Sequence, residues 1–93
     1  MEVEWDEAKS ARCREERGFS FAYAVQAFAD PDRLIEPDTR FDYPEERFRL
    51  MGQIEGRLFV VIFTRRGERT RIISARKANR REQDHYRSRP DRR

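Results

Sequence analysis

The side chains with the clearest chemical potential are arginines at alternate positions of two segments. Arg47 and Arg49 alternate in one predicted strand, and Arg69 and Arg71 alternate in another. Alternate residues of a strand share one face of a sheet, so neighbouring antiparallel strands can bring Arg47 or Arg49 near Arg71. The same alternation places Arg76 on the opposite face. Guanidinium groups hold phosphate oxygens through paired hydrogen bonds and stack on bases, so this pattern predicts a cationic patch for a polyanion.

Acidic and basic residues elsewhere in the chain are candidates for proton transfer. Glu45, Glu46 and Glu82 are the candidate bases, although surrounding cations favour an ionised carboxylate that orients arginine rather than accepting a proton. Lys9 can act as a base only if its neighbours favour the neutral amine, and His85, the one histidine, is a minor candidate. The alternative is structural: solvated arginines in salt bridges with Glu45 and Glu46, and a solvated Lys9.

The cationic residues are concentrated in the second half of the chain. The 93 residues carry 21 Lys and Arg against 18 Asp and Glu, a net charge of +3. Residues 1–46 hold 13 acidic and 6 basic side chains, a balance of −7, whereas residues 47–93 hold 5 and 15, a balance of +10. This asymmetry indicates a polyanion binder. The codon usage of a GC-rich genome is the alternative reason for the arginine excess.

Length and composition restrict the class of protein. One domain is expected, covering residues 1–87, followed by a disordered basic tail at 88–93. The single cysteine, Cys13, can form neither a disulfide framework nor a zinc site. With no signal peptide or long apolar run, we expect a cytoplasmic protein without membrane contact, metal or cofactor. The thin core of so small a domain favours a protein partner.

Three helices are predicted to position these side chains. The first spans residues 7–17, after an N-cap at Asp6. The second begins after Ser20, where apolar residues recur at helical spacing. The third spans residues 80–87 and has Asn79 as its cap.

Strands fill the middle of the chain. Turn signals at Glu55-Gly56 and Arg66-Gly67 separate three predicted strands, 47–54, 57–65 and 69–76. The middle strand is almost continuously apolar, which is typical of a strand covered on both faces. Two shorter segments, 3–5 and 34–35, are candidate strands, and 37–44 is a loop. The pattern predicts an α+β fold with two N-terminal helices, a three- to four-stranded antiparallel sheet and one C-terminal helix.

Short motifs follow one another in a specific order and spacing. They are Glu4–Lys9, Gly18–Phe21, Pro37–Arg40 with Glu45–Phe48, and Arg71–Ala78 followed by Glu82 and Tyr86. Together they resemble the BrnT family of bacterial toxins over residues 3 to about 87. The resemblance implies a RelE-like fold and the toxin of a type II toxin–antitoxin system. It also implies an endoribonuclease that needs no metal, cleaves RNA by attack of the 2′-hydroxyl and inhibits translation.

The resemblance also implies a partner, and together with the residue types it predicts a site in which Arg71 and Arg76 lie in the family motif. A BrnA-like antitoxin is expected to neutralise the toxin in a 2:2 heterotetramer, with DNA contacted only through the antitoxin. The expected catalytic residues are Arg71, Arg76, Lys9, Arg47 and Glu46. The expected RNA-binding residues are Arg17, Arg40, Arg49, Arg65, Arg69 and Lys77.

One position departs from the family pattern. Members often carry Lys-His-Gly at the end of the first helix, where this chain has Glu16-Arg17-Gly18. A histidine there exchanges a proton near neutral pH, whereas arginine stays charged. Two alternatives to an active ribonuclease follow. One is a non-catalytic module that binds nucleic acid or the antitoxin, and the other is an interaction protein that docks an acidic partner.

Overall fold

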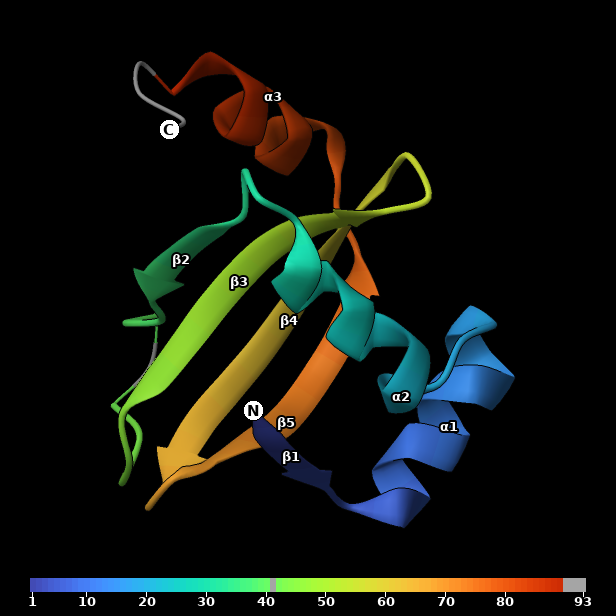
Figure 1. The fold of residues 1–93 in the computed structure, drawn as a ribbon, viewed down its shortest axis with the longest axis vertical. Coiled ribbons are helices and arrows are strands. Elements are labelled where there is room, and N and C mark those ends of the chain that lie inside the picture. Colours follow the sequence, from blue (N-terminus) through green and yellow to red (C-terminus); the bar gives the residue numbers. More distant parts are fainter. Residues whose placement is uncertain (41, 90–93) are drawn as a thin grey trace.

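The computed structural model describes residues 1–40 and 42–89. Figure 1 labels the helices and strands along the chain. In chain order they are β1 (Glu2–Trp5), α1 (Glu7–Arg17), α2 (Phe21–Ala24), the 3₁₀ helix η1 (Val25–Ala29), β2 (Leu34–Pro37), β3 (Arg47–Ile54), β4 (Arg57–Arg66), β5 (Arg69–Lys77) and α3 (Arg80–Ser88). Among the described residues, no helix has the length and apolar character needed to cross a membrane.

The helices begin at the residues that the sequence marks as caps. The Asp6 carboxylate accepts hydrogen bonds from the first-turn amides of α1, and Gly18 ends that helix in the left-handed region at φ 88°. Asn79 and Glu82 form a reciprocal capping box at the start of α3. The second predicted helix is composite, because one α-helical turn, α2, tightens into η1.

The prediction of a three- to four-stranded antiparallel sheet is wrong. The sheet has five strands in the order β1-β5-β4-β3-β2 and is mixed, because β1 runs parallel to β5 with Glu2 opposite Arg69. The cause is a long-range contact that local patterns do not encode. Val3 and Trp5 pack against the same core as β5, which fixes the start of the chain along that edge of the sheet.

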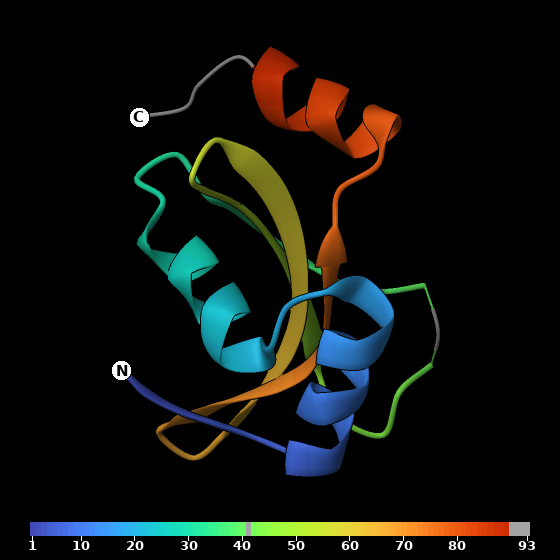
Figure 2. The same ribbon diagram turned by 90° about the vertical axis from the view of Figure 1, so that its right-hand side faces the viewer.

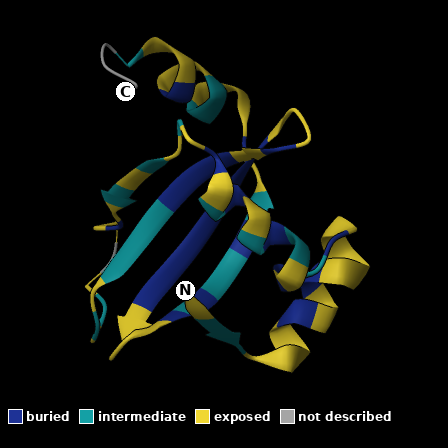
Figure 3. Cartoon of the chain, in the orientation of Figure 1, coloured by how far each residue is buried: buried dark blue, intermediate teal, exposed yellow. Residues whose placement is uncertain are grey.

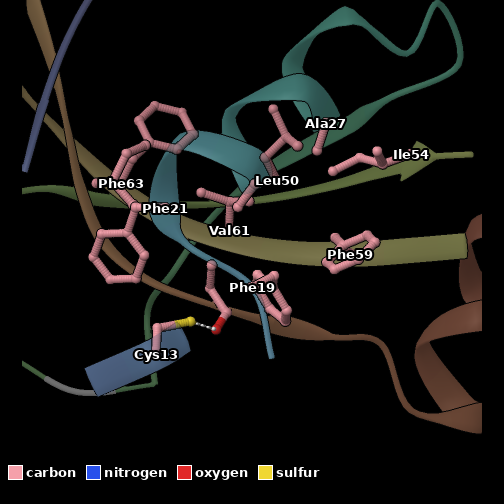
Figure 4. Close-up of a cluster of buried hydrophobic side chains, with 12 residues drawn as sticks. Cys13, Phe19, Phe21, Ala27, Leu50, Ile54, Phe59, Val61 and Phe63 are labelled. Atoms are coloured by element: carbon pink, nitrogen blue, oxygen red, sulfur yellow. Dashed lines mark hydrogen bonds between the residues drawn. The ribbon is translucent and has the colours of Figure 1, made fainter. Parts of the chain in front are cut away.

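The main core lies between one face of the sheet and the helices α1, α2 and η1. Figure 4 shows its side chains, with Phe63 of β4 among those that face the helices. The Cys13 thiol donates to the carbonyl oxygen of Ala75 at 3.6 Å, which ties α1 to β5. A Cβ at Gly52 would overlap the carbonyl oxygen of Ala27, so only glycine permits this approach of η1 to β3.

A second, smaller core lies on the other face, at the end of the sheet that α3 covers (Figure 2). Tyr86 of α3 is buried there, and its hydroxyl donates to Asp30 at 2.6 Å. The Asp30 carboxylate also accepts the backbone amides of Asp32 and Gln53, each at 2.8 Å. Asp30 therefore joins α3, the turn after η1 and β3 in one hydrogen-bonded unit.

Burial decreases from the centre of the sheet outward. Figure 3 shows β4 as a buried strand and most of α1 as exposed. The predicted central strand is confirmed by this burial and by the place of β4 in the sheet. Of the predicted tail at 88–93, Ser88 ends α3 and Arg89 caps it, whereas residues 90–93 lie outside the described part of the chain.

Candidate functional site

Four arginines share the sheet face opposite the one that α2 covers. Arg47 and Arg71 both pair with Thr64 of β4, one from each side. Directly paired residues project to the same side of a sheet, so these two residues flank Thr64, with backbones about 10 Å apart, two strand spacings. Arg49 follows on the same side of β3. The surface formed by Arg47, Arg49, Arg71 and Arg76 is called the arginine face below.

A β-bulge brings Arg76 to this face. Simple alternation along β5 places Arg76 on the other face of the sheet from Arg71, and that expectation is wrong. The β4–β5 register shifts at Ile73, an extra residue of β5. An extra residue in one strand reverses the side to which the following residues point. Arg76 consequently pairs with Val60, which lies on the same side of β4 as Thr64.

Carboxylates from α3 and β2 orient two of these arginines. Both oxygens of Glu82 accept hydrogen bonds from Arg76, at 2.8 and 2.7 Å. An oxygen of Glu36 accepts one from Arg49 at 2.8 Å. These hydrogen bonds hold the pKa of the Glu82 and Glu36 carboxyl groups below the ordinary value. Both glutamates therefore stay ionised at neutral pH and orient arginine rather than accept a proton.

A third carboxylate, from the N-terminal strand, holds Arg71. Glu4 of β1 accepts hydrogen bonds from Arg69 at 3.2 Å and from Arg71 at 3.1 Å. These two hydrogen bonds lower the pKa of Glu4. The parallel pairing of β1 with β5 thus places an acidic partner beside Arg71, a contact that sequence reasoning missed because it missed that pairing.

Arg47 has a looser ionic contact. Its guanidinium lies over the ring of Tyr43, 4.1 Å from the centroid, and its closest recorded carboxylate oxygen, from Glu45, is 4.0 Å away. Within the residues that the structure describes, the Nε atoms of Arg47 and Arg49 are buried and no acceptor reaches them. Among the four arginines of this face, Arg47 has the longest ion-pair distance.

His85 joins the arginine face from α3. Its Nε2 lies 3.1 Å from the carboxylate of Glu36, which also holds Arg49. A carboxylate bound to one ring nitrogen fixes the orientation of an imidazole. Glu82 and His85 are three residues apart on α3 and project from the same side of it. This helical spacing is the sequence signal that could have linked His85 to the site.

Arg40 lies next to this cluster. Its guanidinium donates two hydrogen bonds to Asp38, at 2.8 and 3.1 Å, and they lower the pKa of the Asp38 carboxyl. Hydrogen bonds to Glu82 raise the pKa of Arg76, and the positive charge of Arg40 acts in the opposite direction. Arg40 is therefore close enough to add positive charge to the arginine face.

Three of the expected site residues come from α1 or from the opposite side of the sheet. Lys9 and Arg17 are exposed on α1. Lys77 is paired with Phe59, a residue of the main core, so it lies on the helix-covered side of β5. Arg17, where the resemblance led us to expect a histidine, is the last residue of α1.

The remaining expected residues lie toward the end of the sheet where β4 turns into β5. Glu46 is exposed just before β3, and its backbone carbonyl accepts the Thr64 hydroxyl. Arg65 is exposed, with its guanidinium carbon 5.9 Å from the ring centroid of Phe63. Arg69 is paired with the glutamates of β1.

The chemistry that the site offers is dominated by fixed positive charge with one imidazole at its margin. In the described part of the chain, no three His, Cys, Asp or Glu side chains are grouped so as to hold a metal ion. Preorganised guanidinium groups in a fixed array stabilise negative charge that develops on a phosphoryl group. The arrangement therefore suits binding of a phosphodiester.

Comparison with known proteins assigns the family. None of the curated proteins compared with the chain matches it. The family model described as ribonuclease toxin, BrnT, of type II toxin-antitoxin system matches residues 5–82. That match runs from the last residue of β1 into the first turn of α3 and includes the four arginines, Glu36 and Glu82. The chain belongs to the BrnT family of ribonuclease toxins of type II toxin–antitoxin systems.

Proposed function

We propose that the protein is an endoribonuclease that cleaves RNA on the arginine face without a metal. The observation that carries the proposal is the gathering of Arg47, Arg49, Arg71 and Arg76, from the two strands that flank β4, on one side of the sheet. Electrostatic stabilisation is commonly the largest contribution to such catalysis. A phosphodiester bound there meets cations from both strands, within a family of ribonuclease toxins.

The proposed reaction is an intramolecular phosphoryl transfer. The ribose 2′-oxygen loses its proton to a base and forms a bond to the adjacent phosphorus. The bond from phosphorus to the 5′-oxygen breaks, and that oxygen takes up a proton. The products are a 2′,3′-cyclic phosphate and a 5′-hydroxyl end. In this scheme Arg47 and Arg71 stabilise the charge on the pentacoordinate phosphorus.

His85 is proposed as the group that moves the proton. Glu36 and Glu82 are ionised and engaged with arginines, and Lys9 lies on α1 beside the edge of β5. The imidazole of His85 is held by Glu36 and is accessible, with its side chain 48% exposed. Histidine is the side-chain type best suited to proton exchange near neutral pH. This role is compatible with arginine at position 17, because His85 lies on a different element.

The biological setting proposed is that of a cytoplasmic toxin that inhibits translation and is neutralised by a BrnA-like antitoxin. The family description supports an antitoxin partner. The proposed assembly contains two toxins and two antitoxins, and it contacts DNA only through the antitoxins. An antitoxin that covers the arginine face would block RNA binding directly, because α3 covers only one end of that side of the sheet.

A non-catalytic binding module is the second candidate. One observation favours it: Glu4, Glu36 and Glu82 already neutralise three of the arginines. A chain with these ion pairs can bind RNA or an antitoxin through its charge pattern without accelerating cleavage. The two candidates differ in one measurable property, which is turnover of RNA by the isolated protein.

The test is RNA cleavage by the purified, antitoxin-free protein in excess EDTA. Arg71→Ala is the test variant, and Arg81→Ala, an exposed arginine of α3, is the matched control for loss of one charge. We expect cleavage by the wild-type protein and the control, with 2′,3′-cyclic phosphate ends. Arg71→Ala is expected to lower kcat about 100-fold or more. A folded wild-type protein that binds RNA and does not cleave it would establish the binding module instead.

His85 is tested separately by its pH–rate profile. His85→Gln keeps a hydrogen-bonding group next to Glu36 and removes the exchangeable proton. We expect a loss of roughly 100-fold in kcat and the loss of one limb of the wild-type pH–rate profile. An unchanged profile in this variant would assign proton transfer to another group and leave the role of the arginines intact.

A further inference from the structure

A hollow of about 640 Å³ lies on the side of the sheet opposite the arginine face. It is bounded by the connection from α1 to α2 and by the turn from β3 to β4. Its aromatic floor comes from Phe19, Tyr23 and Phe59, whose ring centroids lie 5.0 Å (Phe19 to Phe59) and 5.8 Å (Tyr23 to Phe59) apart. Its cationic margin is formed by Arg17, Arg57 and Lys77.

The chemistry of this hollow matches a nucleotide. Phe19 and Phe59 are almost fully buried, whereas Tyr23 is half-buried and presents part of its ring. The Tyr23 hydroxyl donates to Glu55 at 2.6 Å, which fixes the ring position. A ligand that suits both parts of the hollow has a flat, weakly polar group for the floor and a negatively charged group for the margin. A base with its phosphate has these two parts.

A row of cations leads from the arginine face to this hollow around the edge of β5. β1 pairs with β5 only as far as Ile72, so the following part of that edge lies next to α1. There a smaller hollow of about 100 Å³ is lined by Lys9, Arg12 and Ser74, among others. Arg17 lines both hollows and so connects them.

The end of β5 makes the same connection through its backbone. Arg76 lies on the arginine face and the next residue, Lys77, lies on the opposite side and lines the large hollow. Consecutive strand residues project to opposite faces. A strand of RNA that crosses the edge of β5 at this point would therefore meet Arg76 on one side of the sheet and Lys77 on the other.

We propose that an RNA strand bound on the arginine face continues around the β5 edge and places one of its nucleotides in the hollow between the α1–α2 connection and the β3–β4 turn. This inference rests on the proposed RNA substrate. It adds that the protein contacts a stretch of single-stranded RNA longer than the cleavage site alone. It assigns Lys9 and Arg17 of α1, and Lys77 on the opposite side of β5 from Arg76, to substrate binding.

The test measures binding of uncleavable RNA, so that its outcome does not depend on turnover. Fluorescein-labelled 2′-O-methyl strands of three and of twelve nucleotides are titrated by anisotropy at several salt concentrations. The test variant is Arg57→Ser with Lys77→Ser, and the matched control is Arg80→Ser with Arg81→Ser. All four side chains are exposed, so each variant is expected to fold, which circular dichroism verifies.

We expect the test variant to lose about tenfold to a hundredfold in affinity for the twelve-nucleotide strand, with the salt dependence reduced by about 1.4 in the log–log slope for two phosphate contacts. The loss for the trinucleotide is expected to be much smaller. The control is expected to lose less than about threefold in affinity for either strand. Nuclear magnetic resonance titration with adenosine monophosphate is expected to shift the resonances of Tyr23 and Phe19.

Two outcomes would overturn the inference without touching the proposed ribonuclease activity. In one, the test variant and the control lose the same affinity for the long strand. In the other, the test variant binds RNA normally and binds the antitoxin weakly, which would assign the hollow to the partner protein. Conversely, length-dependent RNA binding through the hollow by a protein that cleaves nothing would support this inference and refute the ribonuclease activity.

Discussion

Tyr86→Phe tests how α3, and with it Glu82 and His85, is held against the sheet. The hydroxyl that this change removes is buried and lies 2.6 Å from Asp30. Its loss leaves a buried carboxylate with one donor fewer, while the aromatic ring and its packing remain. The change therefore isolates one hydrogen bond to a charged group.

The expected magnitude follows from the chemistry of this hydrogen bond. A hydrogen bond to a charged group contributes about 1.5–3 kcal/mol. Burial and the hydrogen bond to Asp30 raise the pKa of Tyr86 to about 12, so the hydroxyl is neutral and donates to Asp30 at neutral pH. We expect Tyr86→Phe to lower the free energy of unfolding by about 2 kcal/mol at neutral pH.

Urea denaturation followed by circular dichroism measures the change. With a slope of about 1–1.5 kcal/mol/M for a domain of this size, the midpoint is expected to fall by about 1.5 M. Tyr23→Phe is the matched control, because its hydroxyl bonds to the exposed Glu55 and its loss is expected to cost less than about 1 kcal/mol. If Tyr86→Phe has the same urea midpoint as the wild type, the hydrogen bond from Tyr86 to Asp30 does not anchor α3.

The pH dependence supplies a second check with a defined sign. The pKa of Tyr86 is raised in the folded state, so its contribution to stability is fully present below the unfolded pKa of about 10. That contribution is lost as the pH rises through about 12. The difference in unfolding free energy between wild type and Tyr86→Phe should therefore be constant below pH 10 and shrink toward pH 12. A difference that grows over this range would contradict the assignment.

Three further predictions follow from single contacts. Gly52→Ala forces a methyl group against the Ala27 carbonyl and should cost about 3 kcal/mol, lowering Tm by roughly 10 °C or more in calorimetry. Cys13 is buried, which raises the pKa of its thiol, so it should react with a disulfide reagent at least about tenfold more slowly when folded than in guanidinium. Glu82→Gln should tighten RNA binding by removing a charge beside Arg76, and it should cost about 1 kcal/mol of stability above pH 4.5. That cost should disappear as the pH falls, because the folded-state pKa of Glu82 is lowered, and an acid titration of stability measures it.

The elements that the sequence predicts well are those with local start and stop signals. The strand predicted at 47–54 matches β3, and the predictions at 57–65, 69–76 and 80–87 each end one residue early. The turn between β3 and β4 explains this accuracy, because Glu55 and Gly56 both adopt positive φ, as the two-residue hairpin turn requires.

The features that sequence reasoning missed depend on distant contacts or on an irregular backbone. The parallel pairing of β1 joins residues 2–5 to residues 69–72, far along the chain, and leaves no trace in local periodicity. The bulge at Ile73 reverses the alternation on which the side of Arg76 was predicted. The orientation of His85 depends on Glu36, a residue of the edge strand β2 that is distant in sequence. Each error concerns how distant segments pack together, whereas the residue types that carry charge were identified from the sequence.

The carboxylates of the arginine face determine how RNA can bind there. Glu4, Glu36 and Glu82 each hold a guanidinium, so a phosphate that displaces one of them gains only the difference between two ionic contacts. Arg47 has its closest recorded carboxylate oxygen at 4.0 Å, a longer ion-pair distance than those of the other three arginines. A phosphate therefore gains most at Arg47, and binding should begin there. It should then extend toward Arg76, where the bidentate contact with Glu82 makes the exchange least favourable. On this reasoning α3 weakens RNA binding through Glu82 while it supplies the proposed proton carrier, and Glu82→Gln separates the two effects.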